Sequence, residues 1–210
     1  MTEGSSSGVR RGLILAGRAT RLPQKFESVV GGARVVDRAV AAVRAAGLTP
    51  TILSVRPLSA PMASVRADLL DAGPLGALRG SGELVRAPFF LAGADMPLLD
   101  AVSIRALVEL HRPGRSVVPR HPDGAREVLH AVYDLALGDL DRAWARGRSL
   151  RGLVAVLEER GAVDFPSVER FDARTFWDVD TPDDLDRARA WIERSGVPSG
   201  ERARERRDAV

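Results

Sequence analysis

Short apolar runs alternate along the chain with stretches of helical periodicity. The run Gly12–Ala16 is typical of a buried strand, and Arg34–Ala46 has the apolar spacing of a helix that Gly47 would end. The same patterns predict further strands at Thr51–Val55, Met62–Asp68, Pro88–Ala94, Ser116–Pro119, Glu127–Tyr133 and Phe176–Asp180. They predict further helices at Ser103–His111, Leu137–Arg146, Leu150–Arg160 and Pro182–Glu193, and a short helix after the turn Gly73–Gly76. Strands that alternate with helices indicate a three-layer α/β fold, in which helices cover both faces of a mostly parallel sheet.

The ends of the chain differ in composition from the part between them. Residues 1–10 and 196–210 are polar and simple, so we expect disordered tails around a single domain over 11–195. Residues 1–11 contain no apolar core of a signal peptide, and no apolar stretch approaches the ~20 residues of a membrane span. The sequence therefore predicts a cytoplasmic protein with no membrane contact.

Composition narrows the possible chemistry. The 210 residues include no cysteine, which excludes disulfides, thiolate zinc sites, iron–sulfur clusters and cysteine nucleophiles. The three histidines show no metal-ligand spacing, so any metal should be a hard cation held by oxygen. The formal charge of +3 comes from interspersed arginines and acids without interleaved aromatic residues, and we expect no nucleic-acid partner.

The loop after the first predicted strand has the composition of an anion site. Ligands of open α/β sheets bind outside the carboxyl ends of the strands, and the loop there, Gly17–Lys25, combines small residues with Arg21 and Lys25. Small residues let backbone N–H groups face an anion, and the two cations suit a triphosphate. An ordinary turn with solvated basic residues would look similar. Lys25 is the only lysine of this arginine-rich chain, and it stands where a compact charge can be needed.

Acidic residues stand at the ends of other predicted strands. Asp95 can hold Mg²⁺ against substrate phosphates, or it can cap the following turn. Asp178 and Asp180 point to one face of a strand, where a cation can lie between them; alternatively, one caps a helix and the other is exposed. Asp68, or Asp71 if the register of the loop is shifted, can accept two parallel hydrogen bonds from the donor edge of guanine.

Taken in order, these motifs resemble the molybdenum cofactor guanylyltransferase (MobA) family of the nucleotidyltransferase superfamily. The resemblance extends from Gly12 to about Arg189, nearly all of the chain between the two tails. The segments that carry it are Leu15–Lys25, Gly31–Arg34, Asp68 with Gly73–Gly76, Ala94–Pro97, Glu127–Tyr133 and Phe176–Leu185.

The resemblance implies a Rossmann-like sheet of the nucleotide-diphospho-sugar transferase type. It implies transfer of GMP from MgGTP to the phosphate of molybdopterin, which releases pyrophosphate and gives a guanine dinucleotide. GTP and molybdopterin would be the substrates, Mg²⁺ the cofactor, and other molybdenum cofactor assembly proteins possible partners. By position, the resemblance assigns Leu15, Ala16 and Gly17 to the nucleotide, Arg21 and Lys25 to its phosphates, Asp68 to guanine and Asp95 to magnesium. Asp180 is the second metal ligand that we expect.

The chain departs from the family pattern in two places that bear on function. The first motif lacks its second glycine, so the loop between Gly17 and Arg21 is one residue short and Arg18 stands where the family has no Cβ. The late motif has Asp178 and Asp180, whereas the family often has asparagine. These departures leave two alternatives open: a transferase that uses CTP or another acceptor, and a non-catalytic adaptor that binds nucleotide or molybdopterin.

Overall fold

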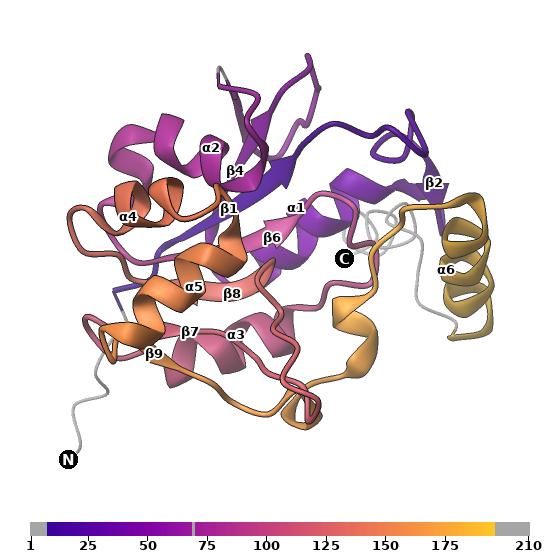
Figure 1. Cartoon of the computed structure of the whole chain (residues 1–210). Helices are drawn as coiled ribbons and strands as arrows, with labels where there is room; N and C mark the ends of the chain where they lie inside the picture. Colours follow the sequence, from indigo (N-terminus) through magenta and orange to yellow (C-terminus); the bar gives the residue numbers. More distant parts are fainter. Residues whose placement is uncertain (1–7, 69, 196–210) are drawn as a thin grey trace.

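The structure, a computed structural model, describes residues 8–68 and 70–195 and is built on one large sheet (Figure 1). Its strand order is β5-β4-β1-β6-β8-β7-β9. The strands are β1 (Arg11–Ala16), β4 (Thr49–Ser54), β5 (Ser64–Ala67), β6 (Phe89–Gly93), β7 (Ser116–Val117), β8 (His130–Tyr133) and β9 (Val163–Asp164). β1 pairs in parallel with β4 and β6, and β8 runs antiparallel between β6 and β7. The expected mostly parallel α/β sheet is confirmed.

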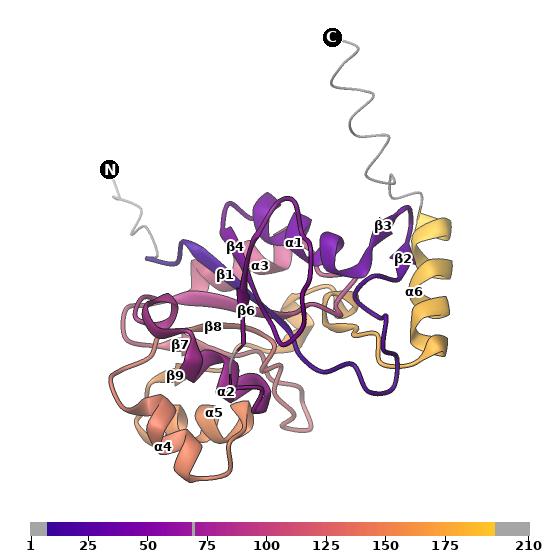
Figure 2. The same cartoon turned by 90° about the horizontal axis from the view of Figure 1, so that it is seen from above.

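Helices cover both faces of this sheet, as Figure 2 shows from above. α1 (Val35–Ala45) and α3 (Ala101–Leu110) lie together on one face, and α2 (Gly73–Gly80), α4 (Asp139–Ala145) and α5 (Leu150–Glu159) lie together on the other. Because side chains alternate along a strand, β1 contributes to two apolar clusters. Ile14 packs with α1 and α3, whereas Leu13 and Leu15 pack with α2 and α5. This alternation fixes the sheet between its two helical layers.

The last helix, α6 (Pro182–Ser195), lies beside a two-stranded hairpin instead of the main sheet (Figure 2). The hairpin consists of β2 (Val29–Val30) and β3 (Ala33–Arg34), and its turn residues Gly31 and Gly32 have φ values of 58° and 78°. Glycine adopts this left-handed conformation without steric cost. The sequence analysis did not predict this hairpin, although a pair of glycines between apolar residues is a signal for one.

One strand prediction is wrong, and the strands expected at Met62–Asp68, Ser116–Pro119 and Glu127–Tyr133 are shorter in the structure. Phe176–Asp180 was expected to be a strand, and this is wrong: the chain forms the short 3-10 helix η3 (Ala173–Phe176) and then runs extended, with one backbone bond of 2.9 Å from Val179 N to Asp95 O. The strand expected at Glu127–Tyr133 is reduced to β8. Two further 3-10 helices, η1 (Gly82–Val85) and η2 (Val168–Arg170), and the strand β9 were not predicted.

The expected tails lie almost wholly outside the described residues. At the inner end of the first one, Val9 is 5% exposed and packs in the core. Among the residues that the structure describes, none of the helices has the length and apolar composition needed to cross a membrane.

Candidate functional site

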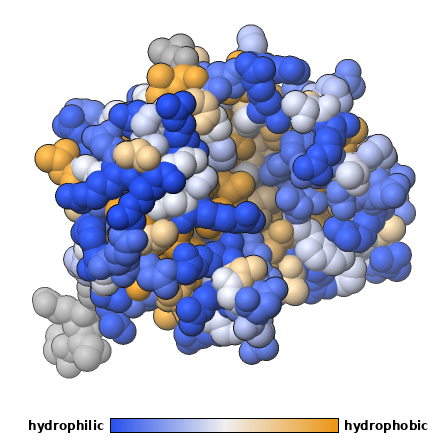
Figure 3. Space-filling view, in the orientation of Figure 1, coloured by the Kyte–Doolittle hydropathy of each residue, from blue (hydrophilic) through white to orange (hydrophobic). Residues whose placement is uncertain are grey.

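A cavity of about 330 Å³ lies where β1, β4, β5 and β6 reach their carboxyl ends. It is lined by residues from five loops and strands that are far apart in the sequence. Seven of the residues singled out above line it: Leu15, Gly17, Arg18, Lys25, Asp68, Asp71 and Asp95. Figure 3 shows this side of the molecule hollowed near its middle, with apolar residues in the hollow and hydrophilic residues around it. Its volume lies in the range of ligand pockets.

Several residues of the cavity wall were not found by sequence reasoning. Helix α2 contributes Gly73, Pro74 and Ala77, β4 contributes Leu53, and the turn before β8 contributes Leu129. Apolar residues next to a strand end have the same hydrophobic pattern as core residues, so the pattern does not show that they line a cavity.

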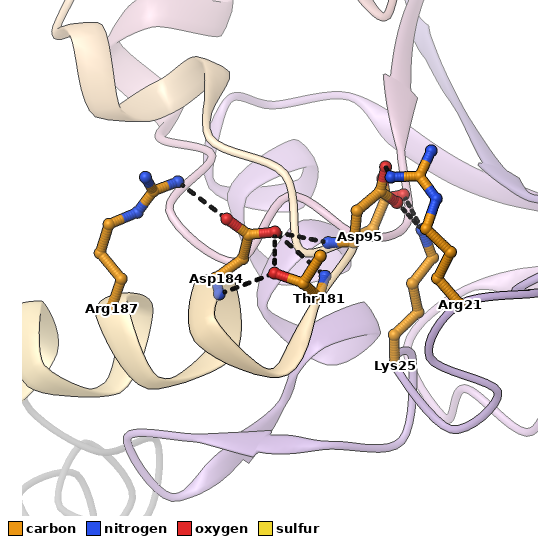
Figure 4. Close-up of polar contacts among 7 residues, drawn as sticks. Arg21, Lys25, Asp95, Thr181, Asp184 and Arg187 are labelled. Atoms are coloured by element: carbon orange, nitrogen blue, oxygen red, sulfur yellow. Dashed lines mark hydrogen bonds and ion pairs between the residues drawn. The ribbon is translucent and has the colours of Figure 1, made fainter.

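Lys25 lies at the centre of a charged cluster at one end of the cavity. Its side chain is only 8% exposed, and its Nζ donates to Asp95 Oδ2 at 2.5 Å and to Asp180 Oδ1 at 2.8 Å (Figure 4). Arg21, largely exposed, approaches Asp180 Oδ2 at 3.5 Å. Burial disfavours the Lys25 ammonium ion, but the two carboxylates outweigh that effect and raise the pKa of Lys25. We name Arg21, Lys25, Asp95 and Asp180 the phosphate-end cluster.

Asp178 adds negative charge beside this cluster. Burial raises the pKa of Asp178, and the nearby carboxylates of Asp95 and Asp180 raise it further. No ready-made group of three or more metal-ligating side chains occurs in the described ranges 8–68 and 70–195. Mg²⁺ needs only one or two protein carboxylates, because substrate phosphates and water complete its shell. The oxygen donors and the excess of negative charge at Asp95 and Asp180 fit such an ion.

Local contacts hold the two carboxylates in place. Asp95 folds back over the end of β6, where a Cβ on Gly93 would collide with it. Arg38 of α1 donates to Pro97 O at 2.9 Å and so fixes the loop that follows Asp95. Asp180 precedes α6, whose first turn is closed by reciprocal bonds between Thr181 and Asp184 (Figure 4): Thr181 Oγ1 donates to Asp184 Oδ2 at 2.7 Å, and Asp184 N donates back at 3.2 Å.

A second ion pair lies at the other end of the cavity. Arg18 Nε donates to both carboxylate oxygens of Asp71, at 2.9 and 2.7 Å. Asp68 also lines this end, and its Oδ1 accepts from the backbone N–H groups of Leu70 and Asp71 at 3.2 and 3.3 Å. We name Arg18, Asp68 and Asp71 the base-end cluster. Asp71 is engaged by an arginine, whereas Asp68 has no arginine partner in the part of the chain that the structure describes.

Two of the expected nucleotide residues, Ala16 and Arg21, do not line this cavity. Ala16 is buried and faces a separate cavity of about 450 Å³ on the other side of the loop, which Gly17 and Phe26 divide from the first. Arg21 lies at the rim and reaches the site only through Asp180. The structure therefore brings together Lys25, Asp95 and Asp180 directly, with Leu15, Gly17 and Asp68 in the same cavity and Arg21 at its edge.

Comparison with known proteins places the chain in a family. A family model described as MobA-like NTP transferase domain matches residues 12–163. A protein of Opitutus terrae named probable molybdenum cofactor guanylyltransferase is 31% identical over 195 residues, which cover 85% of this chain and 94% of that protein. A protein of the same name from Natronomonas pharaonis is 31% identical over 202 residues, which cover 87% and 98% of the two chains.

A solved structure supports the fold. The molybdopterin-guanine dinucleotide biosynthesis protein A of Archaeoglobus fulgidus superposes with a TM-score of 0.65 at 21% identity, over 88% of this chain and 99% of that one. The match of the family model covers more than half of the chain, and the relatives match it over most of their length. The chain belongs to the MobA-like NTP transferase family and is a nucleotidyltransferase.

Proposed function

We propose that this protein transfers GMP from MgGTP to the phosphate of molybdopterin, in the cytoplasm, and releases pyrophosphate. The observation that carries the proposal is one cavity whose wall contains Lys25, Asp95 and Asp68, with Asp180 bound to Lys25 just behind that wall. The buried ammonium group of Lys25 suits the phosphates, and the Asp68 carboxylate suits a base that presents two adjacent N–H donors. The name of the relatives, probable molybdenum cofactor guanylyltransferase, supports this choice of substrates.

The chemistry asks for alignment and charge neutralisation more than for covalent help. An oxygen of the acceptor phosphate attacks the α-phosphorus of GTP, a new P–O–P bond forms, and the bond from the α-phosphorus to the bridging oxygen of pyrophosphate breaks. Lys25 and Arg21, which both contact Asp180, would offset the negative charge of the phosphates and of the departing pyrophosphate. Asp95 and Asp180 would hold Mg²⁺, which offsets charge on the phosphate oxygens when it is bound.

At the base end, we assign guanine recognition to Asp68. A carboxylate can pair with the N1–H and N2–H donors of guanine, whereas adenine and cytosine do not present that edge. Losing one such charge-assisted contact should cost about 1–3 kcal/mol, so GTP should bind roughly ten times more tightly than ATP or more. The backbone bonds to Asp68 Oδ1 hold this side chain in a fixed orientation.

Calorimetric titration with GTP, CTP and ATP in Mg²⁺ tests the base, and pyrophosphate release with molybdopterin tests the reaction. Asp68→Asn should bring the affinity for GTP close to that for ATP. Asp123→Asn, an exposed aspartate of a distant loop turn, is the matched control and should leave the preference unchanged. Equal affinity of the wild type for GTP and ATP would contradict the guanylyl assignment, and a clear preference for CTP would replace it by cytidylyl transfer.

The same assays distinguish an enzyme from an adaptor that only binds. Molybdopterin binding with no pyrophosphate release in the presence of each nucleotide would identify an adaptor. We favour the enzyme because an adaptor has no need for a buried lysine held between two carboxylates. Other proteins of molybdenum cofactor assembly are the expected source and recipient of the pterin, and adding them to the assay should raise turnover if they deliver it.

A further inference from the structure

Arg18 and Asp71 join two opposite walls of the nucleotide cavity. Arg18 follows Gly17 in the loop after β1, and Asp71 lies in the turn just before α2. The guanidinium donates through Nε to both carboxylate oxygens, at 2.9 and 2.7 Å, and through Nη2 to one of them. Both residues line the cavity. The residue that replaces a glycine of the family pattern therefore contacts the segment that carries Asp68.

The turn before α2 is shaped to present the Asp71 carboxylate. Asp71 has a φ of 41°, in the left-handed region that aspartate visits more readily than most residues. Asp68 stabilises the turn by accepting the N–H of Asp71 at 3.3 Å. The hydrogen bonds from Arg18 lower the pKa of Asp71, and the positive charge of Arg56 acts in the same direction. Asp71 is therefore ionised at neutral pH and needs a cation beside it.

Charge explains why this pairing matters for a nucleotide. The cavity already contains Asp68 and Asp95, and a triphosphate brings several further negative charges. An unpaired Asp71 would repel the phosphates and would offer a second carboxylate to the base. Arginine suits the task because its planar fork binds both oxygens of one carboxylate.

We propose that Arg18 is a positioning residue that neutralises Asp71 and leaves Asp68 as the one carboxylate that reads the base. The proposal rests on the proposed nucleotidyl transfer, because it assigns a task within that nucleotide site. It also explains how this chain tolerates an arginine in the shortened loop: the side chain turns across the cavity to the wall, instead of filling the space of the phosphates. The competing explanation is a direct contact of Arg18 with the triphosphate.

A double-mutant cycle on the full chain separates the two explanations. The probes are MgGTP, MgATP and MgCTP, titrated by calorimetry into wild type, Arg18→Ala, Asp71→Ala and the double variant. Neutralisation predicts that Arg18→Ala weakens MgGTP binding about fivefold or more when Asp71 is present, and less than about twofold in the Asp71→Ala background. Arg18→Lys, which keeps the charge but loses the fork, should lie between wild type and Arg18→Ala.

The decisive result is whether adding Asp71→Ala restores the MgGTP affinity that Arg18→Ala has lost. If Arg18→Ala had only collapsed the loop, removing the Asp71 carboxylate would not restore binding. A direct phosphate contact predicts the same loss in both backgrounds, and that result would overturn the proposal. Thermal unfolding of the four proteins should agree within about 2 °C, since an exposed ion pair contributes little to stability.

Failure of the proposed function has a different signature. If the wild type prefers CTP or ATP, the guanylyl assignment fails. The cycle is then run with the preferred nucleotide, and the coupling between Arg18 and Asp71 that it measures still decides the role of Arg18. If GTP is preferred and the cycle is additive, the function stands and the role of Arg18 falls. Absence of binding of all three triphosphates would remove both.

Discussion

The charges around the buried Asp139 and around the buried Lys25 are balanced differently. Asp139 on α4 is fully buried and accepts the N–H of Ala136 at 2.8 Å, Arg142 Nη1 at 3.3 Å, and a bond from Arg160. One carboxylate there has two cations. At the carboxyl edge of the sheet the ratio is reversed, since Lys25 contacts Asp95 and Asp180 and has Asp178 nearby.

The difference indicates what each cluster is for. The partners of Asp139 come from the protein itself, so this cluster is complete without a ligand and stabilises the packing of α4 on α5. Together with Asp178, the phosphate-end cluster has three carboxylates against the buried Lys25 and the exposed Arg21. A site with unbalanced charge gains stability when a cation and its anionic partner arrive together, as a magnesium nucleotide does. The four predictions below test this contrast.

Asp95→Asn should have the largest effect, on turnover and not on folding. A neutral amide is a poor ligand for a hard cation, so Mg²⁺-dependent transfer should fall about a thousandfold or more, which corresponds to roughly 4 kcal/mol. The midpoint of thermal unfolding should change little, because Lys25 keeps its contact with Asp180 while the repulsion between the two carboxylates is removed. Activity near that of wild type would show that Asp95 only shapes the loop after β6.

Asp139→Ala should have the opposite profile. Its removal leaves a backbone N–H and two arginines without their buried partner, and the free energy of unfolding should fall by about 3 kcal/mol. We expect the affinity for MgGTP, measured below the unfolding transition, to match that of wild type. Asp141→Ala, two residues further along α4 and exposed, is the control and should change the free energy of unfolding by less than about 0.5 kcal/mol. A large loss of affinity with normal stability would contradict the division between the clusters.

Lys25→Arg should reduce turnover although it conserves charge. The ammonium of Lys25 is buried between two carboxylates, where the larger planar guanidinium needs a different approach. We expect a loss of about tenfold in kcat, or roughly 1.4 kcal/mol. Arg21→Lys, at the exposed rim of the same cluster, should lose less. Equal rates of wild type and Lys25→Arg would mean that the geometry of the cation at this position is unimportant.

His130→Phe extends the comparison to a buried group that lacks a charged partner. Burial lowers the pKa of His130 to about 3, and neither ring nitrogen has a hydrogen-bond partner among the described residues. The unfolded chain binds a proton near pH 6.5 and the folded chain does not, so stability falls as the pH falls from 6.5 toward 3. Between pH 6.5 and 5.5 this loss is about 1 kcal/mol.

The variant should remove that part of the pH dependence. Phenylalanine can keep the edge-to-face packing on Phe90 and Phe176, so stability at pH 7.5 should be similar to that of wild type or higher. The measurement is chemical unfolding of both proteins at several pH values, with the difference between them isolating His130 from His111 and His121. Parallel curves would mean that His130 has the same pKa in the folded and the unfolded chain.

The sequence predicted the parts of this molecule whose pattern reflects burial. β1 and β6 are buried on both faces and read as continuous apolar runs, and α1 has one apolar stripe, so all three were recognised. The prediction of a strand in the extended segment before α6 was wrong for a physical reason. Trp177–Asp180 alternates apolar and acidic residues because it is extended with Val179 buried, yet it lacks the neighbouring ladder that would make it a strand.

The site was predicted where chemistry follows a strand end and missed where it depends on contacts across the fold. Asp95 could be singled out because an acid follows a buried strand at the binding edge. Which residue pairs with Lys25 could not be known, since Asp180 is brought to it by the first turn of α6. The same holds for Arg18 and Asp71, which become neighbours only because the loop after β1 and the turn before α2 face each other.

The contact between Lys25 and Asp180 also sets an order of events during synthesis. The two residues are 155 positions apart, and Asp180 lies beyond the residues 12–163 that match the family. A ribosome makes the sheet first, because chains emerge and fold from the amino end. While the segment that begins at Asp180 is still being made, Lys25 can pair only with Asp95, and the growing polypeptide has strands and helices without a finished phosphate end. The protein can therefore bind its substrate only late in synthesis, after the sheet that supports the site has formed.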